Sequence, residues 1–272
     1  IVLDQFRGTV LRDGTPAPLY PSVDAPTMNQ HGGQISAGFP LLLSAPLGQV
    51  WYTTDGSDPR QTNGAVSPAA RVFESTTTTT TLVAAGAAWK YLDNGTNAGT
   101  SWRAFAYNDA AWPSGPAPLG YGDGDEATVV SYGPDAGNKY ITTYFRREFQ
   151  VEDPTAFTSL LLKLVRDDGA VVYLNGQEIA RSNMPEGTIN SQTPALGSIG
   201  GADESAFNSF SVAASRLRQG RNVLAVEIHQ NAGNSSDLSF DLSLEGQQTV
   251  GTPLPLNDAT LIKTRAKNGD TW

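Results

Sequence analysis

Short apolar segments alternate with turn-forming residues along most of the chain. Residues 157–165 are mostly apolar and suit a buried strand, and residues 170–174 suit a second strand after the Asp167-Asp168-Gly169 bend. Asn175-Gly176 follows as a two-residue hairpin turn, because both positions of a type I′ turn need positive φ. Residues 177–180 then form the returning strand. Long helical periodicity is absent, so the pattern predicts an all-β sandwich.

Two adjacent carboxylates, those of Asp167 and Asp168, stand at the end of the first of these strands. They repel each other and gain nothing from packing, so backbone N–H groups, an arginine or a cation must compensate them. We expect the bend to lie beside the functional surface. The alternative is that Asp167 pairs with Arg166 or Arg181 while Asp168 caps the bend.

A second group of polar residues follows the apolar residues 223–228. We expect residues 223–230 and 238–244 to form a closing hairpin, with His229, Gln230 and Asp237 at its turn. If the Asp167-Asp168 bend lies at the same end, these residues form a polar pocket. His229 could instead hold the loop by a hydrogen bond, and Asp237 could form an Asx turn with the preceding serines.

The composition narrows the classes of function. The chain has 272 residues and no cysteine, so thiolate metal sites and thiol redox chemistry are excluded. Its net charge of −9 and pI of about 4.7 argue against nucleic acid as a partner. Nothing approaches the roughly 20-residue apolar run of a membrane helix. The chain does not begin with Met and its ends look like cuts inside a longer protein.

Residues 50–60, with the turn Asp-Gly-Ser-Asp-Pro, resemble the signature of the chitobiase/β-hexosaminidase C-terminal domain, an immunoglobulin-like sandwich. Residues 259–272 are similar to the last strand of that domain. The resemblance implies a split immunoglobulin-like domain over 20–76 plus 250–272, a lead-in over 1–19 and a domain inserted at 77–249. The Asn-Gln-His-Gly-Gly run resembles the version found in secreted bacterial proteins with CotH-like kinase modules, which implies an extracellular location.

The insertion resembles the galactose-binding-like jelly rolls. Its apolar strand, Tyr-Leu-Asn-Gly hairpin and Gly-Arg-Asn-Val-Leu-Ala-Val-Glu segment are similar to the sugar-binding domain of β-galactosidases and β-glucuronidases. Its beginning and end look like jelly rolls carried by secreted polysaccharide-active proteins. Asp167-Asp168 also resembles the paired aspartates with which lectins of the protective-antigen-like family hold Ca²⁺ against a sugar. The fold expected is therefore a jelly-roll β-sandwich inserted into a smaller immunoglobulin-like β-sandwich.

Signals for catalysis are weak. The two histidines, His31 and His229, fall in different expected domains, and the sequence has no HExxH motif and no nucleophile elbow. No Gly-rich loop between a strand and a helix could bind a phosphate. A glycosidase needs two carboxylates at ~5–10 Å across a cleft, and the sequence leaves that option open.

Calcium is the expected cofactor. Asp123, Asp125 and Glu126 lie in a Gly-rich segment whose side chains and carbonyls could wrap a hard cation, so they are the metal ligands expected from the sequence. The segment lacks the spacing of an EF-hand, and the ion is expected to be structural.

Aromatic rings are expected to stack on a sugar, because sugars present C–H faces to them. Trp102 and Trp112 have polar neighbours and Tyr121 lies in a Gly-rich loop, so these three are the rings predicted to be exposed for stacking. The alternative is that they are buried, because sandwiches bury tryptophans. Trp89 follows an apolar run and is expected in the core.

The sequence thus predicts a non-catalytic carbohydrate-binding module within a larger secreted, polysaccharide-active protein. Its partner is a polysaccharide or oligosaccharide, and the module is expected to be monomeric and covalently joined to further domains. Polar contacts come from Asp167, Asp168, His229, Gln230 and Asp237. A structural or adhesion spacer without a small ligand is the alternative, and a glycoside hydrolase is the third possibility.

Overall fold

The chain is all-β in the computed structural model, as the sequence predicts; the model describes residue 23 and residues 25–45 and 48–272. It divides into two compact units. The smaller unit contains the described residues before Thr79 together with Gln248–Trp272, and the larger unit is Thr79–Gln247. Strands β6 (Ser75–Val83) and β17 (Leu238–Gly251) carry the chain from one unit to the other. Among the described residues, no helix is long and apolar enough to span a membrane.

The smaller unit is built from short strands around a small apolar core. Trp51 and Tyr52 of one strand pair with residues on both sides, so this strand is central in a three-stranded sheet. The core contains Leu41, Tyr52 and Phe73. The strands are β1 (Thr27–Met28), β2 (Phe39–Leu41), β3 (Leu43–Ser44), β4 (Gln49–Thr53), β5 (Arg71–Val72), β18 (Leu254–Leu256) and β19 (Lys263–Lys267).

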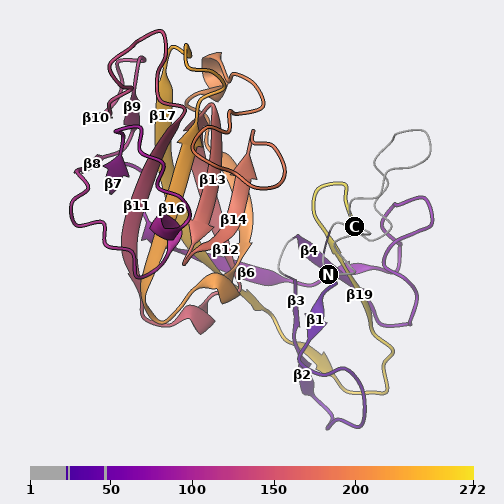
Figure 1. Cartoon of the computed structure of the whole chain (residues 1–272). Coiled ribbons are helices and arrows are strands. Elements are labelled where there is room, and N and C mark those ends of the chain that lie inside the picture. The colour runs from indigo at the N-terminus through magenta and orange to yellow at the C-terminus, as the bar shows by residue number, and fades with distance from the viewer. Residues whose placement is uncertain (1–22, 24, 46–47) are drawn as a thin grey trace. The chain divides into compact units, whose positions relative to one another are not determined.

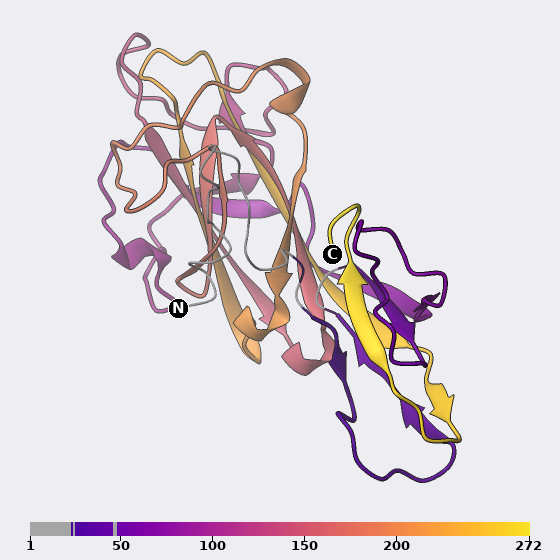
Figure 2. The same cartoon turned by 90° about the vertical axis from the view of Figure 1, so that its right-hand side faces the viewer.

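The larger unit contains two six-stranded sheets, whose strands can be followed in Figures 1 and 2. In the first sheet the order is β10-β9-β17-β12-β15, and β6 also pairs with β17. Its other strands are β9 (Leu119–Tyr121), β10 (Thr128–Val129), β12 (Ser159–Asp167) and β15 (Asn208–Ala213). The second sheet is β14 (Gln177–Ser182), β13 (Gly169–Leu174), β16 (Gly220–His229), β11 (Thr142–Val151), β7 (Ala88–Leu92) and β8 (Ser114–Pro116). Short 3₁₀ turns are η1 (Ser101–Arg103), η2 (Pro154–Ala156), η3 (Gly201–Asp203) and η4 (Ala214–Arg216).

The main core lies between these two sheets. Leu160, Leu162 and Leu164 of β12 point into it, and so do Val172 of β13 and Phe240 of β17. Successive side chains of a strand point to opposite faces, so alternate residues suffice to build one side of this core. Trp89 belongs to the same core, with its ring 5.0 Å from that of Phe240, which confirms its predicted position.

The outer face of the second sheet is covered as well. Val171 and Tyr173 of β13 and Tyr144 of β11 point outward, and Trp102 and Trp112 pack against this surface. Every residue of β13 is therefore buried, which explains its unbroken apolar run. The predicted exposure of Trp102 and Trp112 is wrong, because the segment that carries them lies over an apolar sheet face; their exposed fractions are 0% and 9%.

Of two connections predicted from the sequence, the structure confirms one and contradicts the other. The Asn175-Gly176 turn is confirmed: both residues have positive φ, and Leu174 pairs with Gln177 across it. The predicted closing hairpin is wrong, because β16 and β17 belong to different sheets. The loop after His229 crosses from one sheet to the other instead of reversing within one.

Candidate functional site

Five strand ends meet at one end of the larger unit. Asp167 ends β12 opposite Ser239 near the start of β17, and Gly169 begins β13 opposite His229 at the end of β16. Tyr121, the last residue of β9, pairs with Leu238. The bend at Asp167-Asp168, the loop after β16 and the loop after β9 therefore gather at the same end, which lies at the top of Figure 1.

Asp168 anchors two of the loops at this end. Its Oδ1 accepts a hydrogen bond from the N–H of Ile199 at 2.7 Å, and its Oδ2 accepts one from the N–H of Asn231 at 2.8 Å. Ser235 Oγ lies 3.5 Å from the same Oδ2. The side chain is buried, so Asp168 serves to position loop backbone, and a glycan could not reach it directly.

Asp167 is also buried, but without the hydrogen-bond donors that surround Asp168. Its exposed fraction is 0%, and among the described residues neither carboxylate oxygen accepts a hydrogen bond from an N–H or hydroxyl donor. Burial raises the pKa of Asp167 well above its usual range, and the negative charges of Asp168 and Asp237 raise it further.

The two arginines considered as partners for Asp167 are bound elsewhere. Arg166 Nε donates to Ser182 Oγ at 2.9 Å, and Arg181 makes a bidentate pair with Glu178 at 2.8 Å. Within the described part of the chain, neither forms an ion pair with Asp167. The prediction that Asp167 pairs with Arg166 or Arg181 is therefore wrong. The charge of Arg166 acts on Asp167 without a direct contact, so a proton or a cation is left to compensate the carboxylate.

Three carboxylates surround the outer side of this end. One oxygen from each of Asp123, Glu204 and Asp237 lies within 4.8 Å of the others. Burial, followed by the charges of Asp237 and Glu204, raises the pKa of Asp123 to about 6. Gly122 permits the close approach: its φ is +109°, and a Cβ there would lie 2.8 Å from Asp237 Cα.

Asp123 also belongs to the grouping expected from the sequence, with Asp125 and Glu126. Both carboxylate oxygens of Glu126 are already engaged, because they accept hydrogen bonds at 3.0 Å from the N–H groups of Asp123 and Gly124. Asp125 is exposed. In this second group, Glu126 therefore stabilises its own loop through backbone hydrogen bonds. A cation bound there would have to replace the bonds from Asp123 and Gly124 to Glu126.

His229 and Gln230 are fully buried supports. His229 Nδ1 lies 2.8 Å from the carbonyl oxygen of Thr193 and 3.0 Å from Thr142 Oγ1, so the ring holds the loop at Thr193. Gln230 Nε2 donates to the carbonyl oxygen of Asp237 at 2.7 Å, which fixes the backbone of Asp237. Direct contact of these two side chains with a glycan is contradicted by their exposed fractions of 0%.

The aromatic ring exposed at this end is that of Tyr132. It is 37% exposed and meets Tyr121 at 5.2 Å between ring centroids, while Tyr121 itself is buried, so the predicted exposure of Tyr121 is wrong. Lys139 Nζ lies 5.5 Å from the centroid of Tyr132 and donates to the carbonyl oxygen of Ser235. Sequence reasoning did not select Tyr132 or Glu204, because each lies in a loop without a recognisable motif.

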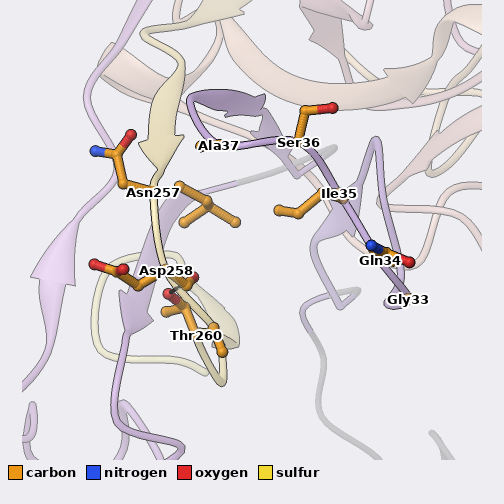
Figure 3. Close-up of a pocket in the computed structure, with 10 residues that line it drawn as sticks. Gly33, Gln34, Ile35, Ser36, Ala37, Asn257, Asp258 and Thr260 are labelled. Atoms are coloured by element: carbon orange, nitrogen blue, oxygen red, sulfur yellow. Dashed lines mark hydrogen bonds between the residues drawn. The ribbon is translucent and has the colours of Figure 1, made fainter.

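A separate cavity of about 290 Å³ lies in the smaller unit, between residues 33–37 and 256–260. Figure 3 shows the side chain of Ile35 directed into the gap, whereas Ser36, Asn257 and Asp258 point away from it. Polar groups do not converge on this cavity as they do at the end of the larger unit. We therefore take the acidic end, defined by Asp123, Asp167, Asp168, Glu204 and Asp237, as the candidate functional site.

No protein-family model matches the chain, and no curated protein matches it in sequence. Among solved structures, a β-glucuronidase of Bacteroides uniformis is similar over 62% of this chain and 18% of its own, at 19% identity and a TM-score of 0.41. A β-glucuronidase from Ruminococcus gnavus is similar over 62% of this chain and 29% of its own, at 13% identity and a TM-score of 0.39. The chain thus spans less than a third of either enzyme, and the resemblance to the chitobiase C-terminal domain stays a prediction.

Proposed function

We propose that the larger unit is a non-catalytic carbohydrate-binding module of a larger secreted, polysaccharide-active protein. The observation that supports this most is the convergence of Asp123, Glu204 and Asp237 at one end of the sandwich, where Tyr132 is half-exposed. Carboxylate oxygens accept hydrogen bonds from sugar hydroxyls, and an aromatic face packs against sugar C–H groups.

The proposed roles differ from those predicted from the sequence. Asp123, Glu204 and Asp237 accept hydrogen bonds from the glycan, and Tyr132 provides the stacking ring. Asp168, with its bonds to two loops, positions them. The smaller unit acts as a spacer that presents the module.

Affinity gel electrophoresis of the full chain against a panel of soluble polysaccharides tests this proposal. At least one polysaccharide should retard the wild-type chain, and Tyr132→Ala should weaken that retention at least tenfold, a loss of about 1.4 kcal/mol. Phe105→Ala is the matched control. This half-buried ring lies 4.2 Å from the guanidinium of Arg221, near the opposite end of β16, so retention should be unchanged.

Two results would contradict the proposal. Absence of retardation by every polysaccharide would favour the structural or adhesion spacer. Hydrolysis of chromogenic glycosides that is lost in Asp237→Asn would favour a glycosidase, since a catalytic pair needs carboxylates across the bound sugar.

A further inference from the structure

The carboxylates of Asp123, Glu204 and Asp237 come from three separate loops, yet their oxygens lie within 4.8 Å of one another. Groups of acidic side chains occur on many protein surfaces without a ligand. At that separation three negative charges repel one another. The fold holds them together despite this repulsion.

Buried oxygens without partners lie next to this group. In the part of the chain that the structure describes, hydrogen-bond partners are lacking for both oxygens of Asp167, for Tyr121 Oη and for Gln230 Oε1. Tyr121 pairs with Leu238 and Asp167 pairs with Ser239, the two residues that follow Asp237. Gln230 donates through its Nε2 to the carbonyl oxygen of Asp237. Buried polar atoms are normally satisfied, so such a set of oxygens around Asp237 calls for a positive partner.

The basic side chains nearby do not supply that partner. Among the described residues, no arginine or lysine forms an ion pair with Asp167 or Asp237. Arg166 Nε donates to Ser182 Oγ, and its Nη1 is buried without a hydrogen-bond partner. Lys139 donates to the carbonyl oxygen of Ser235 and lies over the rings of Tyr121 and Tyr132. The atoms of this set that could bind a cation are oxygens, and the chain has no cysteine. His229 Nδ1 is held at Thr193, and its Nε2 faces Glu227 Oε2 at 3.4 Å. An all-oxygen set with several carboxylates suits a hard divalent cation, and Ca²⁺ accepts six to eight such ligands in flexible geometry.

We propose that the acidic end binds a divalent cation of the Ca²⁺ class, with Asp123, Glu204 and Asp237 as carboxylate ligands and Asp167 as the buried charge behind them. The ion would then lie between Asp123, Glu204 and Asp237, and Asp125 and Glu126 would not be ligands. The Glu126 oxygens are engaged by backbone N–H groups. The ion joins the loops that follow β9, η3 and β16. The ion would bind the same three carboxylates that are proposed to face the glycan, but its binding does not require the sugar.

Titration of the full chain with the metal alone tests the proposal. Tb³⁺, which replaces Ca²⁺ and emits when nearby tyrosines are excited, should bind close to Tyr121 and Tyr132, and added Ca²⁺ should displace it. Calorimetry with Ca²⁺ should give one site per chain. Asp237→Asn and Glu204→Gln should each weaken Ca²⁺ binding at least tenfold.

Asp125→Asn is the matched control. It removes a carboxylate from the exposed loop without touching the proposed ligands, so Ca²⁺ affinity should change less than twofold. Near-UV circular dichroism verifies folding, and the half-buried Glu204 provides a second variant if Asp237→Asn fails to fold.

Three results would overturn the proposal. The first is a wild-type chain that shows neither heat of binding with Ca²⁺ nor tyrosine-sensitised Tb³⁺ emission. In that case a proton shared by Asp167 and Asp168 would compensate the buried charge. The second is Asp125→Asn losing as much affinity as Asp237→Asn, which would place the ion in the other loop. The third is unchanged affinity in both Asp237→Asn and Glu204→Gln. Because no sugar is present, failure here leaves glycan binding to be judged by its own assay.

Discussion

Replacing Trp102 with alanine removes the indole that fills the outer face of the second sheet. The ring is fully buried, with its centroid 4.7 Å from that of Tyr144 and 5.9 Å from that of Tyr173. Truncation of a buried tryptophan to alanine costs about 3–5 kcal/mol in the free energy of unfolding. At about 2–4 °C per kcal/mol for a domain of this size, the melting midpoint of the larger unit should fall by about 6–20 °C.

Urea unfolding of the full chain, followed by near-UV circular dichroism and fluorescence, measures this loss. Trp102→Phe should cost less than Trp102→Ala, because an aromatic ring still packs on Tyr144. The change to phenylalanine also removes an indole N–H that has no hydrogen-bond partner among the described residues. Tyr132→Ala, at a half-exposed ring, should cost less than about 1 kcal/mol.

A loss below about 1 kcal/mol for Trp102→Ala would refute this packing, because it is the cost expected of an exposed side chain. The ring would then lie at the surface, where the sequence alone places it. The conclusions that the outer face of the second sheet is covered and that every residue of β13 is buried would then also be wrong.

Further predictions concern ionisation and the loop after β9. Arg265 lowers the pKa of Asp58 to about 2, so this pair stabilises the smaller unit above pH 3.8 and the contribution is lost as the pH falls toward 2. Asp58→Asn should cost less than about 1 kcal/mol at pH 7, because the side chains of Asp58 and Arg265 are both about 40% exposed. The difference in unfolding free energy between variant and wild type should shrink as the pH falls toward 2. The pKa of Asp167 is raised, so in EDTA the wild-type larger unit should lose stability as the pH rises above 3.8. Asp167→Asn should be the more stable protein at pH 7 under those conditions, and a less stable variant would contradict the burial of an uncompensated carboxylate. Gly122→Ala should cost about 1–3 kcal/mol in urea unfolding, because φ is positive there and the added Cβ meets Asp237 Cα at 2.8 Å; a neutral effect would argue against that close approach.

The periodicity of the chain was sufficient to predict the fold class and the turn at Asn175-Gly176. Both depend on local chemistry: alternation of apolar residues and positive φ at two successive positions. The closing hairpin was predicted wrongly because residues 230–237 are as able to cross between sheets as to reverse within one. Sequence separation alone does not distinguish these two paths.

The site shows the same limit. Asp167, Asp168 and Asp237 were selected from local repulsion and polarity, but the approach of Glu204 to Asp237 arises from tertiary structure, since η3 and the start of β17 are far apart in sequence. The burial of Trp102 was missed because its polar neighbours in sequence do not reveal that the ring packs against the apolar outer face of a sheet. Exposure of an aromatic residue is a property of the whole fold.

The anchoring by Asp168 has a consequence for engineering. Its two oxygens grip main-chain N–H groups of Ile199 and Asn231, so the attachment is insensitive to which side chains those positions display. The side chains at positions 199 and 231 could therefore be varied while both loops stay attached to Asp168, and variants with new ligand preferences could be selected.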